Sequence, residues 1–373
     1  MPADLLEDLL EDIEELVRCE SPSSDPAALA RSMDVVARVG ARRLGAEPER
    51  LGIHLRWRLG DGPSRVLLLG HHDTVWPLGS LATHPYTVDD GVLRGPGCFD
   101  MKTGLALAFR VAAGRGAVTL LVTGDEELGS PGSRELVEEE ARNAEAVLVL
   151  EASAPGGALK IERKGVSVYE LAVTGLAAHA GLEPERGRNA TIELAHQILA
   201  IAGLADPAMG TTVTPTLLTA GTARNTVPAT GTVAVDVRAR TAAEQQRVDA
   251  AIRALRPVVP GVRLDVRGGV NRPPLEEAMS SALFAQAAAI AVRLGQPPLT
   301  GVAVGGGSDG NLTAGAGTPT LDGLGAVGGG AHADDEHVLL AELPHRAALL
   351  SALLDELLAT ATNPAVAAGA PRP

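Results

Sequence analysis

The sequence is short of aromatic residues and of positive charge. Its 373 residues include only three Phe, two Trp and two Tyr. So few aromatic side chains leave the core to Ala, Leu and Val, and they offer no platform on which single-stranded nucleic acid could stack its bases. The 32 basic residues stand against 46 acidic ones, and the formal net charge of −14 repels phosphate backbones and anionic lipid. The sequence therefore predicts neither a nucleic-acid partner nor a membrane partner.

Cysteines and long apolar runs are also scarce. Cys19 and Cys98 form neither a CxxC pair nor the even disulfide framework of small secreted domains. The first residues, 1–7, lack the basic and apolar segments of a signal peptide, and no run of about 18 apolar residues occurs. We expect a cytoplasmic protein with two reduced thiols.

Short apolar runs alternate with helical stretches in the first part of the chain. Three runs are almost entirely apolar: 66–69, 118–122 and 146–150. Helices are expected around them, at 4–18, 26–44, 101–113 and 131–143. Strands that are apolar on both faces are typical of parallel sheets covered by helices. The pattern predicts an α/β layered domain.

The pattern changes near residue 164. Strand, helix, strand, strand, helix and strand are expected in turn at 165–174, 189–202, 211–220, 230–239, 241–255 and 262–267. This β-α-β-β-α-β order is that of ferredoxin-like domains. The chain then continues with a helix at 276–294, a Gly-rich loop at 305–310 and a short strand at 319–322. A last helix is expected at 338–360, followed by a tail from Asn363 that is expected to fray. We therefore assign residues 1–163 and 273–373 to one domain and 164–272 to an inserted domain.

Three of the predicted strands end directly in ionisable residues. The segments 71–73 and 125–127 follow the first two strands, and Glu151 follows the third. In open α/β sheets ligands bind beyond the carboxyl ends of the strands, so these residues should converge in one crevice. Asp100 before a helix and His332 after a glycine run add to the set.

So many carboxylates cannot all ionise at contact distance without a compensating charge. Mixed imidazole and carboxylate groups are ligands that zinc accepts, and five such groups with one bridging carboxylate suffice for two ions about 3.5–4 Å apart. A further carboxylate that is not a ligand can then serve as general base. We expect Glu126 and Glu127 to point to opposite sides of an extended backbone, so that one binds metal and the other addresses water.

In order and spacing, these motifs resemble those of the di-zinc amidohydrolase superfamily, which contains glutamate carboxypeptidase, acetylornithine deacetylase, succinyl-diaminopimelate desuccinylase and aminoacylase. The motifs are His71 to Val75, Gly97 to Lys102, Asp125 to Glu127, Glu151, and Ala331 to Asp334. The resemblance implies a zinc-peptidase-like three-layer α/β catalytic domain with an inserted ferredoxin-like α+β lid and dimerisation domain. It also implies a homodimer and two zinc ions, for which cobalt should substitute.

The resemblance further implies a role for each residue of the catalytic domain. The first zinc ion would be held by His71, Asp100 and Glu151. The second would be held by Asp100, Glu127 and His332, with Asp100 bridging. Asp73 would orient His71, and Glu126 would be the general base.

The inserted domain carries a second set of matching motifs: 177–181, 188–190, 224–228 and 235–238. The match implies that His179 reaches the partner subunit's active site and stabilises the oxyanion, while Asn225 and Arg238 hold carboxylate or carbonyl groups of the substrate. Arginine suits this task because its planar fork binds a carboxylate with two hydrogen bonds. Arg272 is a further candidate, and Gly307 lies in a loop whose backbone N–H groups could receive the substrate carboxylate.

Other readings of the sequence are possible. Gly306 to Gly310 fits the GxSxG pattern of serine hydrolases, but that reading leaves the five metal-type residues unexplained. Gly323 to Gly328 fits GxGxxG, yet no helix is expected after it, so we predict a turn-rich loop. A catalytically inactive binding or scaffold protein of the same fold is a third hypothesis, and the intact Glu126 argues against it.

The choice of substrate stays open between two classes. The segments 305–309 and 329–334 are most similar to glutamate carboxypeptidase, which favours release of a C-terminal acidic residue from a small peptide or N-acyl substrate. The alternative is an N-acyl amino acid deacylase of the acetylornithine deacetylase or succinyl-diaminopimelate desuccinylase type.

Overall fold

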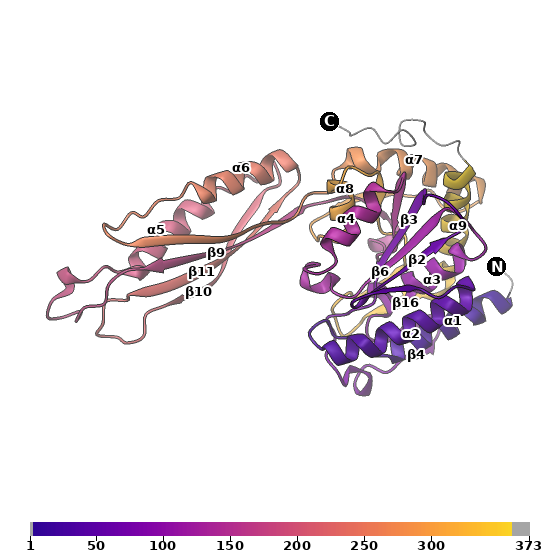
Figure 1. Ribbon diagram of the computed structural model, residues 1–373, viewed down its shortest axis with the longest axis horizontal. Coiled ribbons are helices and arrows are strands. Elements are labelled where there is room, and N and C mark those ends of the chain that lie inside the picture. The colour runs from indigo at the N-terminus through magenta and orange to yellow at the C-terminus, as the bar shows by residue number, and fades with distance from the viewer. Residues whose placement is uncertain (1–2, 360–373) are drawn as a thin grey trace. The chain divides into compact units, whose positions relative to one another are not determined.

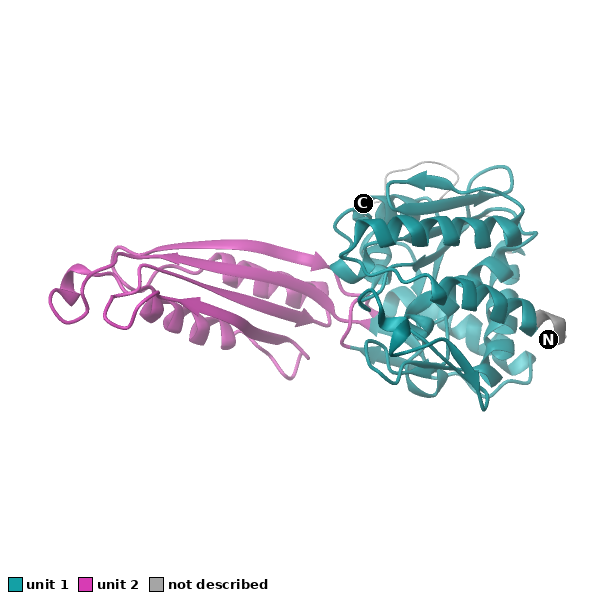
Figure 2. Cartoon of the chain, turned by 90° about the horizontal axis from the view of Figure 1, so that it is seen from below, with its two compact units in different colours: residues 1–162, 277–304, 308–373 teal, residues 163–276, 305–307 magenta. Residues whose placement is uncertain are grey.

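The computed structural model describes residues 3–359, which form two compact units (Figure 2). Unit 2 consists of Arg163–Glu276 together with Gly305–Gly307, whereas the predicted insertion was 164–272. The other described residues belong to unit 1. The predicted fraying tail from Asn363 lies outside the described residues.

Unit 1 is built on a six-stranded sheet with the order β1-β2-β6-β3-β7-β14. The strands are β1 (Glu49–Leu51), β2 (His54–Leu59), β3 (Val66–His71), β6 (Val118–Thr123), β7 (Ala146–Val149) and β14 (Thr320–Leu321). The last four run parallel, as their apolar sequences predict, and every residue of β3, β6 and β7 is buried. Strand β2 is not among the predicted strands; it pairs antiparallel with β6 and makes the sheet mixed.

Helices cover both faces of this sheet (Figure 1). One core joins Leu68 of β3 to side chains of α1 (Ala3–Arg18), α2 (Pro26–Leu44), α3 (Thr103–Ala112), α7 (Glu277–Arg293) and α9 (Leu343–Ala359). Leu67 and Leu69 point to the opposite face and pack with Val137 of α4 (Arg134–Arg142) and Leu312 of α8 (Asp309–Gly315). Because successive strand residues face opposite sides, unit 1 has three layers.

Short strands complete unit 1. They are β4 (Thr87–Asp89), β5 (Val92–Arg94), β15 (Gly328–Gly329) and β16 (His337–Leu339) in one sheet, and β8 (Leu159–Arg163) with β13 (Gly301–Val304) in another. The last helix was predicted to begin at residue 338 but begins at Leu343, because His337–Leu339 pairs with β5. Among the described residues, no helix has both the length and the apolarity that crossing a bilayer requires.

Unit 2 has the predicted element order. Its elements are β9 (Gly165–Thr174), α5 (Ala190–Ala202), β10 (Thr212–Ala220), β11 (Thr230–Ala239), α6 (Ala242–Arg253) and β12 (Arg263–Arg272). The strands form an antiparallel sheet in the order β10-β11-β9-β12. Alternate residues such as Leu171 and Val235 are buried and pack with Leu194 of α5 and Val248 of α6. The predicted fold class is therefore confirmed.

Candidate metal and catalytic site

Most of the predicted site residues of unit 1 lie at the carboxyl ends of neighbouring parallel strands, whereas Asp100 lies in the turn before α3 and His332 follows β15. His71 is the last residue of β3, Glu126 and Glu127 follow β6, and Glu151 follows β7. One expectation was wrong: Glu126–Leu128 is a 3₁₀ turn and not an extended segment. The turn forms because the N–H groups of both glutamates donate to Asp73, at 3.2 Å and 3.1 Å.

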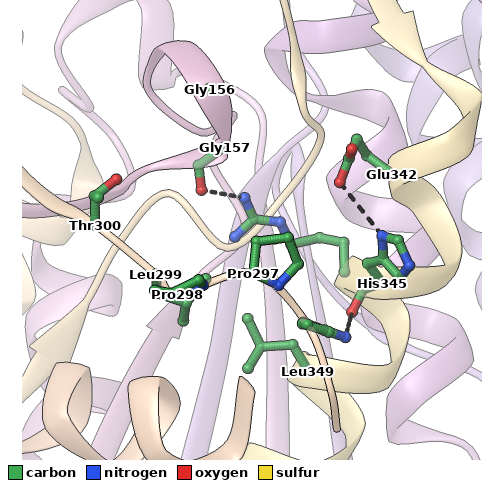
Figure 3. A pocket seen from close by; sticks show the side chains of 11 residues that line it. Gly156, Gly157, Pro297, Pro298, Leu299, Thr300, Glu342, His345 and Leu349 are labelled. Atoms are coloured by element: carbon green, nitrogen blue, oxygen red, sulfur yellow. Dashed lines mark hydrogen bonds and ion pairs between the residues drawn. The ribbon is translucent and has the colours of Figure 1, made fainter. Parts of the chain in front are cut away.

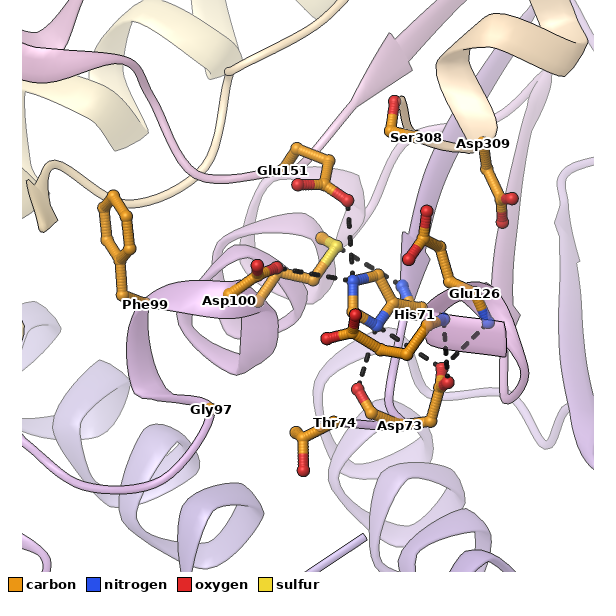
Figure 4. A network of polar contacts seen from close by, with 12 residues as sticks. His71, Asp73, Thr74, Gly97, Phe99, Asp100, Glu126, Glu151, Ser308 and Asp309 are labelled. Atoms are coloured by element: carbon orange, nitrogen blue, oxygen red, sulfur yellow. Dashed lines mark hydrogen bonds and ion pairs between the residues drawn. The ribbon is translucent and has the colours of Figure 1, made fainter. Parts of the chain in front are cut away.

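The side chains form two groups that share Asp100. In the first, Nε2 of His71 lies 3.5 Å from Oδ1 of Asp100 and 3.5 Å from Oε1 of Glu151 (Figure 4). In the second, Nε2 of His332 lies 3.3 Å from Oδ2 of Asp100 and 3.3 Å from Oε1 of Glu127. Asp100 thus presents one carboxylate oxygen to each group, and within each group all ligand atoms lie within 4.8 Å of one another.

Both groups fit a divalent cation. Ligand atoms bound tetrahedrally to zinc at about 2.0–2.1 Å are about 3.3–3.4 Å apart, close to the separations within both groups. Three of the atoms, Nε2 of His71, Oδ1 of Asp100 and Oε1 of Glu127, are buried and have no hydrogen-bond partner among the described residues. Because a buried unpaired polar group costs about 1–3 kcal/mol, these atoms require a partner that a cation would supply.

The electrostatics of the site agree with this reading. Burial alone would lower the pKa of His71, but the surrounding carboxylates, Asp100 foremost, raise it well above its ordinary value. Contacts with Asp100 and Glu127 raise the pKa of His332 to about 10. Burial would raise the pKa of Asp100, but His332 and His71 hold it well below its usual range. The positive charge of the two protonated histidines therefore balances the negative charge of the carboxylates, a role that a bound metal ion would otherwise fill.

Asp73 lies behind these groups and is fully buried. Its carboxylate accepts hydrogen bonds from Ser23 Oγ at 2.7 Å and from the two glutamate N–H groups. Nδ1 of His71 lies 2.9 Å from the Asp73 carbonyl oxygen and 3.4 Å from its Oδ1. With a cation bound, a proton held on Nδ1 would leave the lone pair of Nε2 to ligate that cation beside Asp100 and Glu151.

His179 and Asn225 lie on adjacent segments of unit 2. His179 is exposed and pairs with Thr226 in an isolated β-bridge, and the Asn225 carbonyl accepts from the N–H of Ala180 at 2.9 Å. Nδ1 of His179 accepts from the backbone N–H groups of Gly181 and Leu182, at 3.2 Å and 3.1 Å. The neutral imidazole therefore carries its proton on Nε2, where it can donate.

The predicted arginines of unit 2 lie in one row. Arg238 on β11 and Arg272 on β12 both pair with Val166 of β9. Arg272 is buried, whereas the guanidinium of Arg238 is one-third exposed and binds Asp236 through Nε and Nη2, each at 2.9 Å. Gly307 lies next to the guanidinium of Arg163, whose Nη1 donates to the Gly307 carbonyl oxygen at 3.4 Å.

The serine of the GxSxG pattern has a structural role. Ser308 lies between β13 and α8, but its side chain is fully buried. Its Oγ donates to Asp322 at 2.7 Å and accepts from the N–H of Gly310, so it caps α8. No described histidine contacts it, which argues against a serine nucleophile. Gly323 to Gly328 leads into the short strand β15 and not into a helix, as predicted.

A separate cavity of about 130 Å³ in unit 1 holds none of the predicted site residues (Figure 3). It is lined by the Gly156–Gly157 turn, the 296–300 segment and the start of α9. Its buried guanidinium, Arg346, donates to the carbonyl oxygen of Gly157 at 2.6 Å. The cavity does not contribute to the candidate metal groups.

Sequence reasoning missed Glu336. Its carboxylate is only 3% exposed and accepts from the backbone N–H of Asp100 at 3.0 Å. A single acid in a loop carries no pattern of its own. Its position four residues after His332 was the one available signal.

Comparisons with known proteins identify the family of this chain. Residues 67–356 match the model of peptidase family M20/M25/M40. Carboxypeptidase G2 from Pseudomonas sp. (strain RS-16) is 32% identical over 80% of this chain and 75% of its own length. Succinyl-diaminopimelate desuccinylase from Rhodospirillum centenum is 31% identical over 93% of this chain and 96% of its own.

Two solved structures share the fold. Aminopeptidase PepT from Bacillus cereus ATCC 10987 has a TM-score of 0.74 at 22% identity, covering 95% of this chain and 99% of its own. The M20 metallo-carboxypeptidase Sso-CP2 from Sulfolobus solfataricus has a TM-score of 0.73 at 14% identity, covering 94% and 99%. Together with the family match over residues 67–356, these results confirm the resemblance seen in the motifs, and the chain belongs to peptidase family M20/M25/M40.

Proposed function

We propose that this chain is a co-catalytic di-zinc hydrolase of amide bonds that releases a C-terminal acidic amino acid from a small peptide or N-acyl substrate. One observation carries the proposal: two groups of zinc-type ligands share Asp100, and Glu126 belongs to neither. The similarity to carboxypeptidase G2 over 80% of the chain supports the choice of substrate class.

The five ligands divide between the two ions as the two groups do. His71 and Glu151 would hold one ion, Glu127 and His332 the other, and Asp100 both. Bound zinc supplies Lewis acidity, which polarises a carbonyl and lowers the pKa of water to about 7. We expect Co²⁺ to replace zinc, since imidazole and carboxylate ligands suit both ions.

Glu126 acts as general base in this proposal. Its side chain is 8% exposed, and its backbone is fixed because its N–H donates to Asp73. A carboxylate that is not a metal ligand can take the proton of the attacking water and pass it to the leaving amine. Glu127, the next residue, has its Oε1 beside His332 and is committed to the metal group.

Unit 2 supplies the substrate contacts and the oxyanion donor. His179 would stabilise the oxyanion in the partner subunit of a homodimer, because its Nε2–H is free of the hydrogen bonds that occupy Nδ1. Asn225, Arg238 and Arg272 would hold the substrate's carboxylate or carbonyl groups, and the backbone N–H of Gly307 would add one more donor. A substrate carboxylate would compete with Asp236 for the guanidinium of Arg238.

The second candidate is an N-acyl amino acid deacylase acting in the cytoplasm. The desuccinylase from Rhodospirillum centenum covers 93% of this chain, more than carboxypeptidase G2 does. The two functions differ in the part of the substrate that must be recognised: an acidic side chain on the released amino acid in the first, and an acetyl or succinyl group on a diamino acid in the second.

A kinetic panel on the zinc-loaded protein separates them. It would contain N-benzoylglutamate, dipeptides with a C-terminal glutamate, N-acetylornithine and N-succinyl-diaminopimelate. The proposal predicts the highest kcat/KM for substrates in which glutamate is the C-terminal residue and leaves as the amine. Highest kcat/KM for an N-succinyl or N-acetyl diamino acid would favour the deacylase, and undiminished hydrolysis by protein stripped of metal would contradict both.

A further inference from the structure

Glu336 receives four hydrogen bonds from one small region of unit 1. Its Oε1 accepts from the backbone N–H groups of Phe99 and Asp100, at 2.9 Å and 3.0 Å. Its Oε2 accepts from the N–H of Gly97 at 2.8 Å and from Nε1 of Trp76 at 2.6 Å. The carboxylate is 3% exposed, so these donors and not solvent satisfy it.

These bonds connect the segment that carries Asp100, the ligand shared by both groups, to the segment that carries His332, a ligand of the second group. Three of the donors belong to the turn at 97–100, which ends in Asp100. Glu336 itself follows His332 through two tight turns, in which the N–H of Ala333 donates to Gly330 and that of Glu336 donates to Ala333. A shift of Glu336 would therefore move both Asp100 and His332.

We infer that Glu336 is a positioning residue for the metal centre. It holds the 97–100 turn so that the two oxygens of Asp100 face the two groups of ligands, and it couples that turn to His332. This inference rests on the proposed function, because it takes Asp100 and His332 to bind metal.

Only a carboxylate can fill this position. Four N–H groups converge on the side chain, and two donate to each of its oxygens. Glutamine keeps one accepting oxygen and places an NH₂ group against two donors, so E336Q preserves size but loses two acceptor sites. Groups that orient metal ligands from behind change metal affinity by about 10–100-fold when they are altered.

Glu20 provides a matched control in the same unit. Its carboxylate accepts from the N–H groups of Gly79 and Leu81, at 2.9 Å and 2.8 Å. It thus fixes a different loop through backbone donors and contacts none of the metal-type ligands. E20Q should weaken that loop without changing the affinity for metal.

The test compares metal affinity and the visible spectrum of the cobalt-loaded protein in the wild type, E336Q and E20Q. Affinity for Zn²⁺ and Co²⁺ is measured by competition with a chromophoric chelator. We expect E336Q to bind the metals about 10–100-fold more weakly and to change the cobalt absorption bands, while E20Q matches the wild type.

Nuclear magnetic resonance of the indole N–H groups shows whether E336Q is folded. The chain has two tryptophans, and the other indole, of Trp57, donates to the Ala46 carbonyl. In folded E336Q only the Trp76 signal should shift. If E336Q does not fold, E336D replaces it, since the shorter side chain cannot reach all four donors unless the 97–100 turn moves.

The outcomes separate the inference from the proposed function. Wild-type affinity and spectrum in folded E336Q, or in E336D where E336Q does not fold, would overturn the inference alone. A wild-type chain that binds neither zinc nor cobalt would overturn the proposed function and the inference with it. Equal weakening in E20Q and E336Q would show a general loss of stability and would also overturn the inference.

Discussion

Replacing Asp73 with asparagine tests whether one buried carboxylate fixes both glutamates of the site. Oδ1 of Asp73 accepts from the N–H of Glu126, and Oδ2 accepts from the N–H of Glu127 and from Ser23 Oγ. Asparagine keeps one oxygen and turns an NH₂ group toward the remaining donors, so one or two of the three bonds are lost. Hydrogen bonds to charged groups contribute about 1.5–3 kcal/mol each, and we expect the free energy of unfolding to fall by about 2–5 kcal/mol.

The assay is urea denaturation of metal-free protein at neutral pH, followed by circular dichroism. Ser23→Ala is the graded control, because it removes only the Ser23 bond to Asp73 and should cost about 1.5–3 kcal/mol. Asp73→Asn should also weaken zinc binding about 10–100-fold, since it frees the backbone of Glu127. Unfolding free energies for Asp73→Asn within about 0.5 kcal/mol of the wild type, with unchanged zinc affinity, would refute the reasoning.

Three further predictions concern single residues. Glu126→Gln should keep its metal content by mass spectrometry and lose about 10²–10⁴-fold in kcat, and a wild-type kcat would exclude Glu126 as the base. Burial lowers the pKa of His72 from 6.5 to about 4, so the folded state keeps it neutral while the unfolded state protonates it. Neutral His72 therefore stabilises the fold above about pH 6.5, and about 3 kcal/mol of the free energy of unfolding is lost as the pH falls toward 4. In urea titrations at pH 7 and 4.5, the free energy of unfolding of His72→Gln should fall less between the two pH values than that of the wild type. An equal fall in both proteins would contradict this prediction. Mixing inactive His179→Ala subunits with inactive Glu126→Ala subunits should restore activity, and none after verified exchange would show that His179 does not act across a dimer interface.

The elements that build the site were predictable because burial marks them in the sequence. β3, β6 and β7 are buried on both faces and therefore appear as nearly continuous apolar runs, which in β6 are interrupted by threonine. The rule that carboxyl ends of parallel strands meet at one edge then brings His71, Glu127 and Glu151 together. The alternation in β9 and β11 likewise marks a sheet with one covered face.

Other features depend on contacts that are remote in the sequence. Strand β2 (His54–Leu59) contains two arginines, which hide its strand character in the sequence. Both arginines form short ion pairs with the buried Glu140, a partner that the local sequence does not reveal. The 3₁₀ turn at Glu126 depends on hydrogen bonds to Asp73, 53 residues earlier in the chain. Glu336 reaches Asp100 across 236 residues. Local pattern carries no information about such partners.

The number of metal ions per chain tests the central claim most directly. Zinc content is measured by mass spectrometry after saturation and dialysis, in the wild type and in the Asp100→Ala and His332→Ala variants. Because the two groups of ligands share Asp100, the account predicts two ions in the wild type, one in His332→Ala and none tightly held in Asp100→Ala. A wild-type chain that holds fewer than two ions, or an Asp100→Ala variant that still holds two, would contradict it.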